Sequence, residues 1–120
     1  MTLVHGDFFP GNVLVTGRRV SGIVDWEEAH LDWPPWDVAG AIGSFCVVDD
    51  DVDRDACRGF VDPYRAGGGS TNPSDDHLLI PLVRVKLILE VLRAPTDRHP
   101  RWEHQRHNLR LLENLANRHD

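Results

Sequence analysis

The stretch LVHGDFFPGNVLV, residues 3–15, places a polar, turn-forming segment between two short apolar runs. Glycine, proline, aspartate and asparagine favour turns and add little to a hydrophobic core. Ordering such a segment costs conformational entropy without burying much apolar surface. The stretch therefore needs a functional reason to be ordered, and the residues in question are His5, Gly6, Asp7, Pro10, Gly11 and Asn12.

A β-hairpin is predicted directly after this stretch. Valine and isoleucine favour strands over 13–15 and 20–24, and Gly17 supplies a turn between them. The two ends of an antiparallel hairpin lie side by side, so Asn12 at its entry and Asp25 at its exit become neighbours in space.

Helices are predicted further along the chain. Pro34 and Pro35 mark the start of a helix with a small, closely packing apolar face. The acidic run 49–55 is expected to open a second helix that reaches about Tyr64, because carboxylates suit the positive end of a helix. Residues 65–74 are a loop by composition, and Ser74 is expected to cap the next element.

Two more helices complete the prediction. The nearly continuous apolar run 78–92 predicts a helix buried on most of its circumference, which Pro81 begins or kinks. A last helix over 101–117 carries an apolar stripe of Leu109, Leu112, Leu115 and Ala116, widened by Leu111. The expected fold class is mainly α with a small β-hairpin, in one domain spanning residues 1–120.

Composition narrows the classes of function. The formal net charge of -6 argues against a nucleic-acid partner, because such proteins gather Lys and Arg to neutralise phosphates. Cys46 and Cys57 match no zinc or redox motif, which fits a reducing cytoplasm. No signal peptide or membrane-spanning run is visible, so the chain is expected to be soluble and cytoplasmic, without a membrane partner.

Three oxygen-bearing side chains suit phosphoryl transfer. An Asp carboxylate and an Asn carbonyl oxygen are suitable ligands for Mg²⁺, and Asn12 and Asp25 fit that role. Asp7 lies a few residues upstream in the same loop, where it can orient and deprotonate a hydroxyl nucleophile. Catalysis of phosphoryl transfer consists mainly of such positioning and charge neutralisation.

Three ordered motifs make the resemblance specific. HGDFFPGN resembles the His-Gly-Asp-(four residues)-Asn catalytic loop of the aminoglycoside phosphotransferase and choline kinase-like family, the counterpart of the protein-kinase catalytic loop. GIVDWEEA resembles that family's metal-binding segment, and WPPWDVAGAI resembles the helix start that follows it. The match implies a protein-kinase-like C-terminal lobe.

The resemblance also implies roles for individual residues. Asp7 corresponds to the catalytic base, Asn12 and Asp25 to the magnesium ligands, and His5 to the residue that braces the loop. Asp37 corresponds to a buried carboxylate that accepts hydrogen bonds from catalytic-loop backbone. The implied cofactors are Mg²⁺ and ATP or GTP, and the implied partner is a small-molecule hydroxyl acceptor.

The sequence departs from this family in one respect. No counterpart of the N-terminal nucleotide-binding lobe or its phosphate-binding lysine is recognisable, and Lys86, the only lysine, lies in a predicted helix far downstream. We therefore expect a catalytic lobe that is inactive or weakly active alone. A fragment, a mis-assigned start or a truncated gene product would each explain such a chain. Apolar surface left exposed at the cleft is then expected to cause self-association.

Two competing functions remain open at this point. One is a non-catalytic binding or regulatory remnant that keeps the fold. The other is a metal-dependent phosphohydrolase, which is less favoured because it usually needs more carboxylate or histidine ligands.

Several polar side chains carry two interpretations. Asp50 and Asp51 belong either to a solvated helix start or to a surface that recognises a cationic acceptor such as an aminoglycoside or a choline-like amine. His99, His104 and His107 are interpreted as a solvated polar face rather than a metal site, because no carboxylate or cysteine completes the ligand set. Packing roles are expected for Trp26, Trp33, Trp36 and Trp102.

Overall fold

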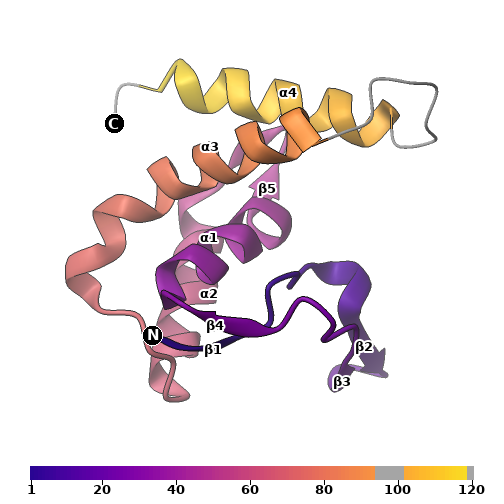
Figure 1. Cartoon of the computed structure of the whole chain (residues 1–120), viewed down its shortest axis with the longest axis vertical. Helices are drawn as coiled ribbons and strands as arrows, with labels where there is room; N and C mark the ends of the chain where they lie inside the picture. Colours follow the sequence, from indigo (N-terminus) through magenta and orange to yellow (C-terminus); the bar gives the residue numbers. More distant parts are fainter. Residues whose placement is uncertain (94–101, 119–120) are drawn as a thin grey trace.

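Four helices make up most of the ordered backbone. The computed structural model describes residues 1–93 and 102–118, and at 102–104 the backbone only. The helices are α1 (Pro34–Phe45), α2 (Arg54–Ala66), α3 (Asp76–Arg93) and α4 (Trp102–Ala116). In Figure 1, α4 lies along α3, and α1 lies below α3. The predicted mainly helical class with small β elements is confirmed.

The core lies between the helices. Pro34 and Pro35 start α1 because their fixed φ suits the first turn of a helix. The N–H groups of that turn have no partner within the helix, so proline loses no hydrogen bond there. Small residues then let α3 approach closely, so that a Cβ added to Gly43 would lie 3.5 Å from Val83. The buried cluster comprises Val38, Ala39, Ile42, Cys46, Val52, Val61, Leu79, Val83, Leu87, Leu111 and Leu115.

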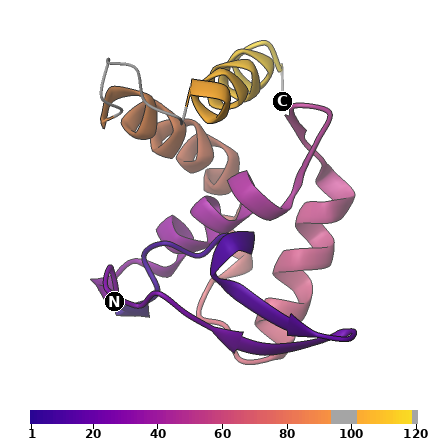
Figure 2. The same ribbon diagram turned by 90° about the vertical axis from the view of Figure 1, so that its right-hand side faces the viewer.

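The strands form antiparallel pairs. β2 (Val13–Thr16) pairs with β3 (Arg19–Ile23), which confirms the predicted hairpin to within one residue at each end. Figure 1 shows this hairpin set apart from the helices, at the lower right. Figure 2, turned by 90° about the vertical axis, shows the hairpin in front of the lower part of α2.

Two strand pairs are too short to be detected from alternation in the sequence. β1 (Thr2–Val4) pairs with β4 (His30–Asp32), and β5 (Val47–Val48) pairs with β6 (Asp51–Val52). The β1–β4 pair brings the start of the chain beside the start of α1. It thereby fixes where the polar stretch after β1 begins.

The acidic run does not open α2 as expected. Its first residues form the β5–β6 turn, where Asp49 and Asp50 have φ of 51° and 59°. Valines on both sides favour strands, and aspartate is one of the few residues that tolerates left-handed backbone. α2 begins only at Arg54, and the Asp53 carboxylate caps it by accepting a 2.7 Å bond from the N–H of Ala56.

The start of α3 also differs from the prediction. Asn72, not Ser74, caps the 3-10 turn η2 (Pro73–Asp75), by accepting a 3.1 Å bond from the N–H of Ser74. α3 follows from Asp76, so Pro81 lies inside the helix and does not begin it.

Only one side of α3 is buried, which corrects the expected all-round burial. Leu79, Val83 and Leu87 recur every four residues and face the core, whereas Val85 and Ile88 are 45% and 44% exposed. The reason is that α1 and α4 both contact α3 and leave the rest of its circumference uncovered. Apolar composition along a helix therefore overstated its burial.

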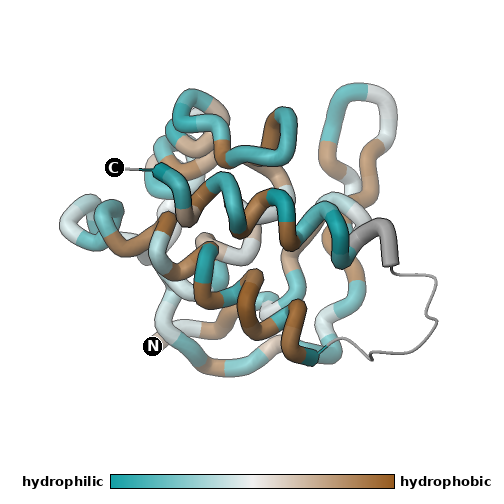
Figure 3. Tube along the Cα trace, turned by 90° about the horizontal axis from the view of Figure 1, so that it is seen from above, coloured by the Kyte–Doolittle hydropathy of each residue, from teal (hydrophilic) through white to brown (hydrophobic). Residues whose placement is uncertain are grey.

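The stripe of α4 is confirmed at Leu111 and Leu115, which are fully buried, and at Leu112, which packs half-buried against the core. Asn108 is also buried, whereas Leu109 is 41% exposed and Ala116 is exposed. Figure 3 shows the apolar positions of α4 recurring among hydrophilic ones. His99, and the side chains of Trp102 and His104, lie outside the described residues.

The two cysteines, Cys46 and Cys57, are free thiols. Burial raises the pKa of Cys57 to about 12. No helix in the described ranges is both long and apolar enough to cross a bilayer.

We expect Ile42→Ala to lower the free energy of unfolding by about 2–5 kcal/mol, because it leaves a cavity between α1 and α3. Ile42 is 1% exposed, and Leu92, at 74%, provides the matched control. Leu92→Ala should change stability by less than about 0.5 kcal/mol. Urea unfolding followed by circular dichroism measures both, and equal losses would contradict this description of the core.

Candidate active site

The segment between β1 and the β2–β3 hairpin, residues 5–12, is called here the HGD loop. His5 and Asn12, at its two ends, are buried at 6% exposure. Gly6 has φ of +87°, and a Cβ added there would lie 2.4 Å from the carbonyl oxygen of Glu28. Only glycine tolerates both this backbone conformation and this close approach.

The carboxylate of Asp37 holds the start of the HGD loop. Oδ2 accepts a 3.2 Å bond from the N–H of His5, and Oδ1 accepts a 3.0 Å bond from the N–H of Gly6. Asp37 lies in the first turn of α1, where the helix dipole favours a negative charge. Both oxygens therefore hold the backbone immediately before Asp7.

His5 connects the HGD loop to the exit of the hairpin. Its Nδ1 accepts a 3.1 Å bond from the N–H of Asp7, so Nδ1 carries no proton. Nε2 then carries the proton and donates it to the carbonyl oxygen of Val24 at 2.9 Å. Trp26 packs on the imidazole with 4.5 Å between ring centroids. The neutral imidazole thus connects the backbone of Asp7 to the residue before Asp25.

Asn12 and Asp25 come to the same end of the hairpin as Asp7. The side-chain Nδ2 of Asn12 donates to the backbone oxygen of Asp7 at 2.8 Å and lies 3.4 Å from Asp7 Oδ2. The N–H of Val24 donates to the backbone oxygen of Asn12 at 2.9 Å, which brings Asp25 next to this pair. Asp25 has φ of 61°, an uncommon conformation of the kind found at functional positions.

The oxygens of this group are available to a cation. Within the described residues, no Arg, Lys or His pairs with Asp7 or Asp25, and Asn12 Oδ1 accepts no hydrogen bond. The described ranges contain no cluster of three His, Cys, Asp or Glu side chains that could hold a metal ion. Two protein oxygens from Asn12 and Asp25 fit Mg²⁺ only if water and phosphate complete its coordination, which is the usual arrangement for this ion.

Asp50 and Asp51 lie at a different place. Asp50 bonds His107 Nδ1 and Arg110 Nε of α4, each at 2.7 Å, and its pKa is lowered mainly by Arg110 and next by His107. Its backbone oxygen accepts from Asn114, also at 2.7 Å. The structure therefore brings these acidic residues together with α4 and not with the HGD loop.

Sequence reasoning did not find this connection. His107 was interpreted as part of a solvated face, whereas its imidazole is half-buried against Asp50. The spacing of His107, Arg110 and Asn114 at one helical turn was the available signal, because such residues share a face. Their acidic partner is distant in sequence and could not be inferred from that spacing.

Sequence reasoning also gave Lys86 no structural role. Its ammonium lies 4.3 Å from the centre of the Trp36 ring. The signal was a lysine within a largely apolar run, because burying such a side chain requires a specific partner.

The family comparison agrees with this geometry. A family model described as "Phosphotransferase enzyme family" matches residues 1–78, which is more than half of the chain and includes the HGD loop, Asp25 and Asp37. No solved structure matches the chain.

Curated relatives that match the chain include homoserine kinases. The enzyme of Methylobacillus flagellatus is 37% identical over 65 residues, covering 53% of this chain and 20% of the relative. That of Nitrobacter hamburgensis is 40% identical over 48 residues, covering 40% and 15%. That of Rhodopseudomonas palustris is 32% identical over 66 residues, covering 54% and 20%. The match thus spans a fifth or less of these relatives' own length. The family assignment depends on the longer match of the family model to residues 1–78. By that match, the chain belongs to the phosphotransferase enzyme family.

Proposed function

We propose that the HGD loop and the exit of the hairpin form the phosphoryl-transfer site of a small-molecule kinase. The reaction moves the γ-phosphoryl group of ATP or GTP to a hydroxyl group. The observation that carries the proposal is the convergence of Asp7, Asn12 and Asp25, whose oxygens no protein cation neutralises within the described residues. Such a group suits a divalent cation and a phosphate chain.

Asn12 and Asp25 are the proposed holders of Mg²⁺. The Asn12 amide turns its nitrogen toward Asp7 and leaves its oxygen free as a ligand. When bound, Mg²⁺ supplies charge neutralisation to the phosphate oxygens. The uncommon backbone of Asp25 sets its carboxylate at the hairpin exit, where the connection through His5 fixes the preceding residue.

Asp7 is the proposed general base. The acceptor oxygen forms the new bond to phosphorus, the bond from phosphorus to the nucleoside diphosphate breaks, and the hydroxyl proton passes to the Asp7 carboxylate. Hydrogen bonds fix the backbone of Asp7 on both sides: its N–H donates to His5 and its oxygen accepts from Asn12. This rigidity supports the positioning on which the reaction depends.

We propose that the acceptor is an amino acid with a side-chain hydroxyl group, such as the homoserine in the name of the matched relatives. Recognition of a cationic acceptor by Asp50 and Asp51 remains an untested alternative. Support for it is weak, because Asp50 is already paired with His107 and Arg110 and Asp51 with Arg118.

Magnesium-dependent nucleotide binding is the first test. By isothermal titration calorimetry, ATP or GTP should bind in the presence of Mg²⁺, and Asp25→Asn should weaken binding by about tenfold or more, since it removes a charged ligand. Asp49→Asn, which makes the same charge change on the β5–β6 turn, should leave the affinity unchanged. Equal binding by all three proteins would refute the metal site, and no binding by any of them would favour a non-catalytic remnant.

Phosphoryl transfer is the second test. Asp7→Asn should lower the rate of phosphorylation of L-homoserine by about 10²- to 10⁴-fold, the usual contribution of a general base. ³¹P NMR of the reaction with Mg²⁺ and ATP identifies the product, and L-threonine, choline and an aminoglycoside serve as competing acceptors. A rate unaffected by Asp7→Asn would exclude this residue as the base.

Self-association stays a prediction with a defined surface. Leu3 and Leu31 form a cross-strand pair on β1 and β4 and are 67% and 65% exposed. Val15 and Val20 are paired and similarly exposed on the hairpin. Sedimentation velocity should detect dimers or larger species at about 100 µM, the range in which exposed apolar patches associate. Leu3→Glu combined with Leu31→Glu should shift the population to monomer, and a monomeric parent at that concentration would contradict the prediction.

A further inference from the structure

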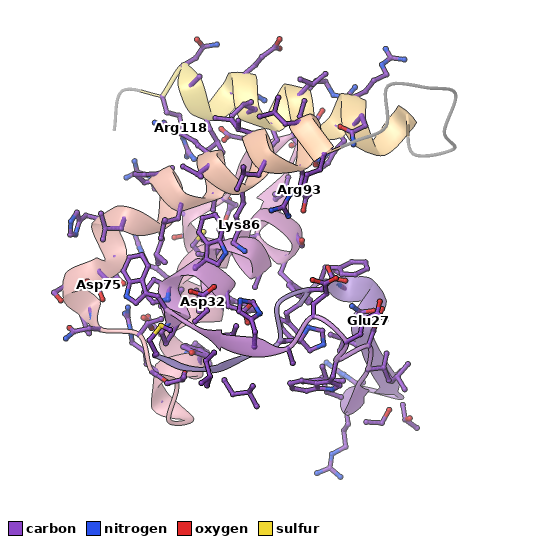
Figure 4. The ribbon with its side chains drawn as sticks, viewed as in Figure 1. Glu27, Asp32, Asp75, Lys86, Arg93 and Arg118 are labelled. Carbon is purple, nitrogen blue, oxygen red and sulfur yellow. The ribbon has the colours of Figure 1, made fainter. Side chains whose placement is uncertain are left out.

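Lys86 links α3 to α1. It is the only lysine of the chain, and its ammonium lies over the ring of Trp36, 4.3 Å from the ring centre. A Cβ added to Gly40, one turn after Trp36, would lie 3.2 Å from Nζ and 3.4 Å from Cδ and Cε. The lysine side chain therefore fills the space that this glycine leaves, on the turn of α1 that contains Asp37. Figure 4 shows Lys86 between α3 and Asp32 of β4.

The charge of Lys86 is balanced through space. Within the described residues its ammonium donates no hydrogen bond and has no carboxylate at ion-pair distance. Burial lowers the pKa of Lys86, and the nearby carboxylates oppose this, Asp37 more strongly than Glu90 or Asp32. Arg93, on the same helix, adds to the lowering. Asp37 is therefore the principal counter-charge of this half-buried cation.

The same carboxylate holds the HGD loop. The Asp37 carboxylate accepts hydrogen bonds from the N–H groups of His5 and Gly6, the two residues immediately before Asp7. Hydrogen bonds to a charged acceptor are stronger than those between neutral groups. The pKa of His30 on β4 is raised chiefly by its bond to the Glu28 backbone, and Asp37 is the last of the causes.

We propose that Lys86 is a positioning residue for Asp7. It acts through the turn of α1 that holds Asp37, whose carboxylate clamps the backbone of His5 and Gly6, and it touches neither Asp7 nor the reacting groups. The structural part of the proposal stands on this geometry. Its consequence for catalysis rests on the proposed function of Asp7.

Hydrogen exchange of the clamped amides tests the structural part. In ¹⁵N-labelled Lys86→Gln, exchange at Gly6 should accelerate by roughly threefold to tenfold relative to the core amide of Ile42, because the clamp loses its cation. Lys86→Arg should restore the ratio, since guanidinium keeps the charge and stacks well on an aromatic ring.

Arg84→Gln is the matched control. It removes one positive charge from the same helix, but the Arg84 guanidinium bonds the backbone oxygen of Leu115 in α4. It should destabilise the α3–α4 contact and leave the ratio of Gly6 to Ile42 exchange unchanged. An unchanged ratio in Lys86→Gln, or the same change in Arg84→Gln, would overturn the proposal.

A reciprocal titration checks the pairing from the other side. Reductive ¹³C-methylation labels only the amines of Lys86 and Met1, so a single side-chain signal reports the lysine. Asp37→Asn removes its strongest stabilising carboxylate and should lower the titration midpoint more than Glu90→Gln does. An equal or smaller shift in Asp37→Asn would show that Asp37 is not the principal partner.

The catalytic part has a separate readout. Lys86→Gln should lower kcat by roughly threefold to tenfold with little change in KM, because misplacing the base affects the transition state more than substrate binding. Lys86→Arg should recover kcat. If the parent transfers no phosphate, the proposed function fails while the exchange result still decides the clamp. If the parent is active and Lys86→Gln retains kcat, the positioning role fails alone.

Discussion

The carboxylate of Asp37 is the constraint on which the candidate site depends. Its two oxygens accept hydrogen bonds from neighbouring backbone N–H groups of the HGD loop, at 3.2 Å from His5 and 3.0 Å from Gly6. A segment with so many turn-forming residues has little apolar surface to hold it, so fixed polar contacts must supply its order. The helix dipole of α1 keeps the charge of Asp37 favourable, and the prolines that start α1 fix where that charge lies.

Hydrogen bonds to backbone groups connect Asp37 with the rest of the candidate site. His5 receives one hydrogen bond from Asp7 and gives another to Val24, and Asn12 closes the loop on the oxygen of Asp7. The Asn12 side chain thus helps to hold the loop, whereas the carboxylates of Asp7 and Asp25 contribute little to its order. Among the described residues the Asp25 carboxylate has no hydrogen-bond partner, and the Asp7 carboxylate has only a 3.4 Å contact from Asn12.

The sequence predicted the local parts of the molecule well. The hairpin and the nearness of Asn12 to its exit follow from alternating valines and a glycine turn, because these depend on residues close in sequence. Asp37 was placed beside the loop only through its resemblance to a known motif. Its two amide partners are more than thirty positions away, and no periodicity encodes such a distance.

The missed features are long-range or depend on packing. Asp50 contacts His107 across 57 positions of the sequence, so composition could show only an acidic run. The exposure of Val85 and Ile88 depends on how many helices surround α3, which the apolar pattern of one helix does not contain. Lys86 and Trp36 are brought together by the same packing of α1 on α3.

The pairing of β1 with β4 has a consequence for how the site assembles. It closes a loop of about thirty residues that contains Asp7, Asn12 and Asp25, and α1 begins two residues later. The entropy of closing such a loop rises slowly with length, by only about 0.6 kcal/mol per doubling. This loop is shorter than those closed by the contacts of Asp50 with His107 and Asn114, which lie 57 and 64 positions away. The hydrogen bonds that order the HGD loop thus come from a contiguous third of the chain, residues 2–37, and the remaining helices support it through α1.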